Sequence, residues 1–226
     1  MIIAPEKRME AKKALINKCE SCLGSGSGCL VCLRKLTIVD RLAEANIPVN
    51  YWFFKMQNYK EGEAKKAILA YIEDIENKLS SGTGLCLAGS YGTGKTTGLC
   101  SVLKNAIFRN YTAYYTTMND LIFYLMDYNT KDEYHYLVTK CQFLVIDEVD
   151  ARHFSNSEEA QKVLGSNFEK IVRYRIQNSL PVLVGTNHAS LEEAFSGQYR
   201  RVIESLMLAK MQTVSVLGKD QRKAHV

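Results

Sequence analysis

The sequence predicts an α/β protein with a parallel sheet flanked by helices, preceded by a small cysteine-containing module. From residue 61 onward, short apolar runs alternate with amphipathic stretches, the pattern of strands and helices in a parallel sheet. A glycine-rich loop joins an early apolar run to the helix expected after it. The 226 residues are 46% hydrophobic and 23% charged, which is typical of globular proteins and excludes wholesale disorder.

Each run and each amphipathic stretch corresponds to one expected element. We expect strands at 85–88, 112–116, 143–146 and 180–185, and helices at 61–79, 95–108, 119–128 and 158–177. The last helix is expected to turn five apolar side chains inward: Val163, Leu164, Phe168, Ile171 and Val172. Thirty-nine residues follow Asn187, too few for a sizeable separate domain, so we expect a minimal or absent C-terminal lid.

The chain is expected to divide into a cysteine module at 1–33, a linker at 34–60 and the α/β domain at 61–226. The linker contains the aromatic run 51–54, which suits packing onto the next domain or stacking on a ligand. The net charge of +5 is concentrated in the N-terminal quarter, because residues 1–60 contain ten basic and five acidic side chains and the rest of the chain is balanced. That excess favours a polyanion such as DNA, and a solvated basic helix at 7–18 explains it equally well.

The sequence contains no sign of a membrane segment or an export signal. No apolar run approaches the roughly 20 residues of a membrane-spanning helix. The first residues turn charged too soon for a secretory signal. We therefore expect a cytoplasmic protein without a membrane partner.

Seven cysteines fall into two groups. Cys86, Cys100 and Cys141 each lie in apolar surroundings and are expected to be reduced core residues. The other four form two CxxC pairs separated by a Gly/Ser-rich loop, at Cys19, Cys22, Cys29 and Cys32. Four thiolates satisfy tetrahedral zinc, so we expect a structural zinc site; redox-active thiols and an iron–sulfur cluster are the alternatives.

Residues 89–96, GSYGTGKT, match the phosphate-binding P-loop pattern at every fixed position, between an expected strand and an expected helix. Glycines let backbone N–H groups curl around phosphate oxygens, and the following helix contributes its positive dipole end. Lys95 is expected to bridge the β- and γ-phosphates, and the Thr96 hydroxyl to bind Mg²⁺. The expected nucleotide contacts are Gly89, Gly92, Thr93, Gly94, Lys95, Thr96, Thr97 and Asp147.

Polar residues follow two later strands. Asp147 comes at the end of the apolar run 143–146, where a carboxylate can hold Mg²⁺, and Glu148 is placed to orient or deprotonate a water. Asn187 follows the strand at 180–185 and can hydrogen-bond both γ-phosphate and water. His188 is given no role. Because no guanine-reading Asn-Lys-x-Asp pattern occurs, we expect ATP.

These features, in this order and spacing, resemble the AAA+ ATPases. Within that class the chain is similar to the DnaC/IstB branch of helicase loaders and transposition helper ATPases. The similarity covers about residues 45–215 and includes the stretches ANIPVNYWFF, GLCLAGSYGTGKTT, YYTTMNDLIFYL, CQFLVIDEVD, LPVLVGTN and FSGQYRRVIESLM. The resemblance implies an AAA+ fold, Mg²⁺-dependent ATP hydrolysis and self-association through the ATP site.

The last of these stretches implies an arginine that reaches a neighbouring subunit's ATP. By register it falls on Arg201, with Arg200 as the close rival. Glu148, Asn187 and Arg201 are then the expected catalytic set. The family pattern has a second arginine four residues later, where this sequence has Ser205.

The resemblance further implies a replicative helicase and single-stranded DNA as partners. The cysteine module would bind the helicase ring. Aromatic and basic side chains suited to DNA, or equally to a tyrosine-rich core, are Tyr111, Tyr114, Tyr115, Tyr124, Tyr128, Lys104 and Arg109. The alternatives are an IstB-like regulator of a transposase on duplex DNA and a small-molecule kinase, which would need an arginine-rich lid that the tail lacks.

Overall fold

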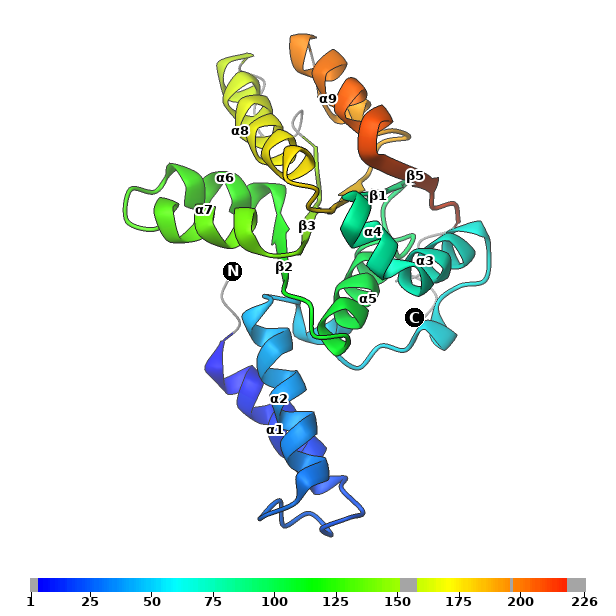
Figure 1. Cartoon of the computed structure of the whole chain (residues 1–226), viewed down its shortest axis with the longest axis vertical. Coiled ribbons are helices and arrows are strands. Elements are labelled where there is room, and N and C mark those ends of the chain that lie inside the picture. Colours follow the sequence, from blue (N-terminus) through cyan, green and yellow to red (C-terminus); the bar gives the residue numbers. More distant parts are fainter. Residues whose placement is uncertain (1–3, 151–157, 196, 219–226) are drawn as a thin grey trace.

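In the computed structural model, which describes residues 4–150, 158–195 and 197–218, a five-stranded parallel sheet has helices on both faces (Figure 1). The strand order is β2-β3-β4-β1-β5. The strands are β1 (Gly84–Ala88), β2 (Ala113–Thr117), β3 (Phe143–Asp147), β4 (Val182–Thr186) and β5 (Met211–Ser215). The helices are α1 (Pro5–Asn17), α2 (Leu30–Glu44), α3 (Glu63–Glu73), α4 (Ile75–Ser81), α5 (Lys95–Phe108), α6 (Met118–Met126), α7 (Lys131–Lys140), α8 (Glu158–Gln177) and α9 (Gly197–Lys210), with short 3-10 turns at Val49–Tyr51, Met56–Asn58 and Glu192–Ala194.

Two apolar cores lie on opposite faces of the sheet, because successive side chains of a strand point to opposite sides. On one face, Leu85 and Leu87 pack with helices α2, α3 and α5. On the other face, Cys86 and Ala88 pack in the core formed with α6, α7, α8 and α9. Both faces are covered, as expected for a parallel sheet. Within the described ranges, no helix is both long and apolar enough to cross a lipid bilayer.

The expected strands are confirmed, and two expected helices need correction. The helix expected at 61–79 is divided at Asp74 into α3 and α4. In α8, Phe168, Ile171 and Val172 are buried, but Val163 is 42% exposed, so its inward placement was wrong. The side chain of Leu164 lies outside the part of the chain that the structure describes.

Helix α7, helix α9 and strand β5 were not expected. The residues after Asn187 form α9 and then β5, which adds an edge strand to the sheet beside β1. They add a helix and an edge strand to the sheet domain.

The N-terminal residues form an antiparallel helical hairpin, α1 and α2, at the lower end of Figure 1. Asp40 on α2 accepts hydrogen bonds from Arg8 (2.7 Å) and pairs with Lys12 (2.5 Å), which ties the two helices together. Helix α2 is continuous across the boundary expected between residues 33 and 34. The hairpin is therefore joined to the sheet domain through an unbroken helix.

The segment after α2 packs against the sheet. The Tyr115 amide donates to Ala45 O (2.8 Å), and Asn46 Nδ2 donates to Tyr115 O (3.0 Å). These bonds satisfy backbone groups of the edge strand β2 that would otherwise be free to pair with a strand of another sheet. Trp52 is buried and donates to Ile47 O (2.6 Å), so the aromatic run serves packing at this position.

Arg175 on α8 is fully buried at the amino-terminal edge of the sheet. Its guanidinium donates to Val138 O (2.8 Å), Gln142 O (3.0 Å) and Pro181 O (2.9 Å). One side chain thus joins the end of α7 and the starts of β3 and β4. Desolvation lowers the pKa of Arg175, and the arginine remains charged because its ordinary pKa is far above neutral.

We expect Arg175→Lys to lower the free energy of unfolding by about 2–5 kcal/mol, because an ammonium cannot reach all three carbonyl groups and leaves buried acceptors without donors. Urea unfolding measures this change. The matched control is Arg173→Lys, whose exposed guanidinium pairs with Glu169 at 2.8 Å and which we expect to change stability by less than about 1 kcal/mol. Equal stability of the two variants would contradict the role of Arg175.

Candidate functional site

The P-loop connects the carboxyl end of β1 to the first residue of α5. Gly92 (φ 72°) and Gly94 (φ 98°) both adopt backbone conformations that residues with a Cβ rarely adopt. Lys95 is largely buried, and its Nζ donates to Gly89 O (2.8 Å) and Ser90 O (2.7 Å). The ammonium group is therefore held against the loop at the amino end of α5, where backbone N–H groups and the helix dipole favour an anion.

Asp147 ends β3 in a buried position, and both of its carboxylate oxygens accept hydrogen bonds. Tyr115 Oη donates to Oδ2 (3.1 Å), and the Glu148 amide donates to Oδ1 (2.9 Å). On the neighbouring strand, a Cβ at Gly185 would lie 2.0 Å from Oδ1, so only glycine fits beside this carboxylate. Burial and the charge of Asp147 raise the pKa of Tyr115, which keeps the phenol a hydrogen-bond donor.

Glu148 follows in a left-handed backbone conformation (φ 55°), which costs a non-glycine residue about 1–3 kcal/mol. Its side chain is exposed. Desolvation, together with the negative charges of Asp147 and Asp120, raises the pKa of Glu148. A carboxylate with a raised pKa is a better proton acceptor at neutral pH.

The loop after β3 is bonded to the end of β4 by a backbone and a side-chain contact. The Val149 amide donates to Gly185 O (2.8 Å), and Thr186 Oγ1 donates to Val149 O (2.9 Å). Half-buried Asn187 follows directly on β4. Asn187 is therefore the residue directly after the end of β4 that bonds to the Glu148 loop.

Tyrosines from the segment before the sheet domain also reach this site, and the sequence analysis missed their role. Tyr59 Oη donates to Gly94 O (3.2 Å). Burial, aided by Cys100 and Asp147, raises the pKa of Tyr51, and a side-chain hydrogen bond with Thr96 opposes that rise. The local sequence pattern does not predict these contacts, because they join residues about 35 to 45 positions apart.

Tyr115 was considered only as a DNA contact or a core residue. Its position on β2 pairs with Val145 on β3, two residues before Asp147. Since residues two apart on a strand share a face, the phenol and the carboxylate point to the same side. That register could have identified the contact if the strand pairing had been known.

The arginines expected to reach a neighbour lie on α9. Arg200 and Arg201 are both exposed, while Ile203 and Leu206 of the same helix are buried. Ser205, where a second arginine was expected, is also exposed. Both arginines are thus accessible to another molecule.

The residues considered for DNA binding differ in how far their side chains are exposed to solvent. Tyr114, Tyr115 and Lys104 are buried and belong to the core. Lys104 donates to Tyr51 O (2.7 Å) and so fixes the aromatic segment. Of the others, Tyr111 and Tyr124 are half-buried, whereas Tyr128 and Arg109 are exposed.

The four N-terminal cysteines converge at the tip of the helical hairpin, and their sulfur atoms all lie within 4.8 Å of one another. The Sγ–Sγ distances are 3.9 Å for Cys19–Cys29 and 3.6 Å for Cys22–Cys32. A tetrahedral ion with metal–sulfur bonds of about 2.3 Å separates its sulfurs by about 3.8 Å, so this cluster fits a four-thiolate metal site. The Gly26 amide lowers the pKa of Cys22 to about 6, which favours the thiolate that a metal needs.

The remaining cysteines are confirmed as core residues. Cys86, Cys100 and Cys141 are buried and unbridged, and burial raises the pKa of each thiol.

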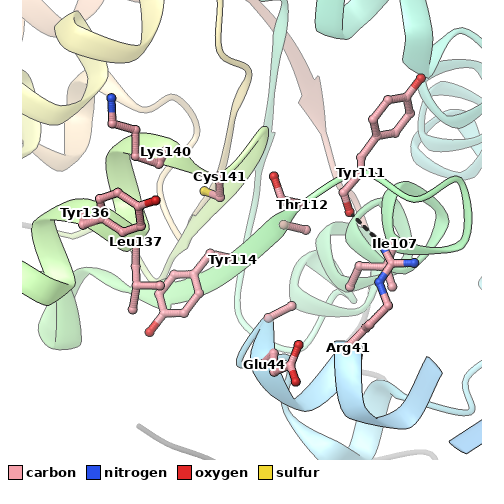
Figure 2. A pocket seen from close by; sticks show the side chains of 12 residues that line it. Arg41, Glu44, Ile107, Tyr111, Thr112, Tyr114, Tyr136, Leu137, Lys140 and Cys141 are labelled. Atoms are coloured by element: carbon pink, nitrogen blue, oxygen red, sulfur yellow. Dashed lines mark hydrogen bonds between the residues drawn. The ribbon is translucent and has the colours of Figure 1, made fainter. Parts of the chain in front are cut away.

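A separate pocket of about 290 Å³ lies between α2, α5, β2 and α7 (Figure 2). Arg41 donates across it to Tyr111 O (3.2 Å), and Glu44, Tyr136 and Lys140 line it. It adjoins the start of β2, while the P-loop, Asp147 and Asn187 all follow the carboxyl ends of strands. The pocket is therefore distinct from the phosphate-binding site.

The strand order, the P-loop after β1 and the acidic residues at the tip of β3 define a P-loop nucleotide-binding fold of the AAA+ type. No protein-family profile and no curated protein matches the sequence. Solved structures do match. DnaI superposes with a TM-score of 0.64 at 19% identity, over 77% of this chain and 94% of that one.

Two further matches have related titles. The DnaC helicase loader gives a TM-score of 0.57 at 20% identity, over 74% of this chain and 99% of that one. The replication initiator DnaA bound to AMPPCP and single-stranded DNA gives a TM-score of 0.58 at 19% identity, over 76% of this chain and 51% of that one. At these identities the comparisons show the fold, and they confirm that the chain has the AAA+ fold expected from its resemblance.

Proposed function

We propose that this protein is an ATP-dependent helicase loader of DNA replication. The observation that carries the proposal is a P-loop next to an acidic pair, Asp147 and Glu148, and a polar Asn187, on a fold shared with DnaI and the DnaC helicase loader. The ATPase domain would use ATP, and the cysteine module would bind the replicative helicase ring.

Each residue of the site has a distinct role in this proposal. The P-loop amides of Gly89 to Gly94, with Thr93 and Thr97, surround the phosphates, and Lys95 leaves its loop carbonyls to bridge the β- and γ-phosphates. Thr96 and Asp147 would hold Mg²⁺, which would neutralise phosphate charge when bound. Tyr115 fixes the orientation of the Asp147 carboxylate.

Hydrolysis would use residues from two subunits. Glu148 orients the attacking water and accepts its proton, and Asn187 hydrogen-bonds both this water and the γ-phosphate. Arg201, exposed on α9, would reach the γ-phosphate held by a neighbouring subunit; Arg200 is the alternative. Activity would then depend on self-association.

The surface of the cysteine module supports a protein partner. Leu23, Leu30 and Leu33 are exposed beside the cysteine cluster at the tip of the hairpin. Apolar side chains grouped on a surface mark interaction sites. The DNA partner would be single-stranded, in keeping with the matched DnaA structure, which contains single-stranded DNA. A transposase regulator acting on duplex DNA is the alternative.

The metal of the four-cysteine cluster would be zinc with a structural role. All four positions of the tetrahedron are filled by thiols, so no open position is left for catalysis. A helical hairpin this short has little core of its own, and a metal at its tip would stabilise the loop between α1 and α2.

We expect Tyr115→Phe to raise the Mg²⁺ concentration needed for half-maximal ATP hydrolysis about tenfold, because the Asp147 carboxylate loses the donor that orients it. Hydrolysis is measured in a magnesium titration. Tyr114→Phe, a buried tyrosine on the opposite face of the same strand, is the matched control and should leave the titration unchanged. An unchanged titration in Tyr115→Phe would show that this hydroxyl does not act on the metal.

We expect about one zinc ion per chain in the purified protein. Cys22→Ser should lose most of the zinc and lower the thermal stability of the hairpin, because three ligands bind zinc more weakly than four. Metal is measured by elemental analysis. Cys86→Ala changes a buried cysteine outside the cluster and should keep the zinc. Iron in place of zinc, or a folded hairpin free of metal, would refute the assignment.

We expect the protein to co-sediment with the replicative helicase of the same source in the presence of ATP. Replacing both Leu30 and Leu33 by serine should abolish the complex while ATP hydrolysis continues, because these exposed side chains are not part of the ATPase site. The control is Leu217→Ser, an equally exposed leucine in the ATPase domain. Absence of a complex in every nucleotide state would contradict the loader and favour the duplex-DNA alternative.

Lys95→Ala tests the ATP-dependent half of the proposal in the same sedimentation. It should lose ATP hydrolysis and any ATP dependence of the complex. Arg201→Ala should bind ATP and fail to hydrolyse it. Loss of ATP binding in Arg201→Ala would contradict a role at a neighbour's site.

A further inference from the structure

His188 and Asp150 face each other across the two loops that carry the proposed hydrolytic residues. His188 Nε2 lies 2.8 Å from Asp150 Oδ2. Asp150 is two residues after Glu148, and His188 directly follows Asn187. The contact therefore joins the loop of the proposed base to the loop of the proposed phosphate sensor.

Both side chains are shielded from water. Asp150 is buried and its Oδ2 has almost no exposed surface, while the His188 side chain is 16% exposed. A buried carboxylate oxygen is costly unless a donor or a positive charge faces it. The imidazole Nε2 is the group that faces this oxygen, and it forms an ion pair with the carboxylate when the histidine is protonated.

Two other contacts join the loop after β3 to the last two residues of β4. The Val149 amide donates to Gly185 O and Thr186 Oγ1 donates to Val149 O. The His188 amide also faces Thr186 Oγ1 at 3.3 Å. Together with the Asp150–His188 contact, the two bonds of Val149 tie the residues after Glu148 to the end of β4 and to the loop that follows it.

We propose that His188 and Asp150 are a positioning pair that locks the Glu148 loop to the Asn187 loop. The inference rests on the proposed ATPase function and adds two residues to it. Neither residue touches ATP or water in this account. The pair holds the backbone turn at Glu148, which is left-handed and costly, so that the base and the sensor keep one relative placement.

The test compares two substitutions of the histidine. His188→Leu removes the nitrogen that faces Asp150 and should lower kcat for ATP hydrolysis by about ten- to a hundredfold, since a misplacement of about 1 Å can cost that much. The dissociation constant for ATP should change less than about threefold, because the P-loop is untouched. His188→Gln can place an amide Nε2 near the same point and should retain most of kcat.

A double-mutant cycle tests whether the two residues act together. Asp150→Ala should lower kcat as His188→Leu does, and the double variant should be no slower than either single variant. In an Asn187→Ala background, His188→Leu should cause little further loss. If His188→Leu and Asp150→Ala lower kcat independently, so that their effects multiply in the double variant, the two residues do not act as a pair. His135→Leu, at an exposed histidine on α7, is the matched control and should leave kcat unchanged.

Hydrogen exchange decides the question independently of ATP hydrolysis. The Val149 amide, bonded to Gly185 O, should exchange at least tenfold faster in His188→Leu than in the unmodified protein, and at the original rate in His188→Gln. If His188→Leu leaves the exchange rate of the Val149 amide unchanged, the pair does not hold the two loops together. If the Val149 amide exchanges faster in His188→Leu but the protein shows no Lys95-dependent ATP hydrolysis, the proposed function is refuted. The contact between the two loops is then still established.

Discussion

The structure depends on a buried guanidinium at the edge of the sheet opposite the proposed nucleotide site. Arg175 bonds to carbonyl groups at the end of α7 and at the starts of β3 and β4. These bonds fix the two strands relative to each other at one end. The consequence appears at the other end, where Ile146 pairs with Val184 and the Asp147 carboxylate lies over Gly185. A shift of one residue would turn Asp147 to the opposite face of the sheet and away from the P-loop.

Much of the fold was predictable, because its strands are short apolar runs and its P-loop has a fixed spacing. Asp147, Glu148 and Asn187 were located correctly at strand ends for the same reason. Strand β5 was missed because it is a half-exposed edge strand, with only Val214 buried. Helix α7 was missed because its sequence is polar, and it is held by tertiary contacts such as those of Tyr134 with the core.

The contacts that refine the site could not be predicted from local pattern. Tyr115 reaches Asp147 across 32 residues, and His188 reaches Asp150 across 38. Each depends on strand register and on which strands are neighbours. A tyrosine within a strand and a histidine after an asparagine are common in any sequence. Neither pattern therefore indicates which carboxylate the side chain contacts. Register is a property of the folded sheet, and the functional geometry at the strand tips follows from it.

The edge strand β2 connects the N-terminal hairpin to the nucleotide site through a continuous series of hydrogen bonds. Helix α2 ends at Glu44, and the next two residues, Ala45 and Asn46, bond to the backbone of Tyr115. The phenol of Tyr115 in turn bonds to Asp147. Because α2 is unbroken from the cysteine cluster to this point, the tip of the hairpin is fixed in orientation relative to the carboxylate expected to hold the metal. The cysteine module is thus joined to the sheet domain by a continuous helix and by hydrogen bonds to an edge strand.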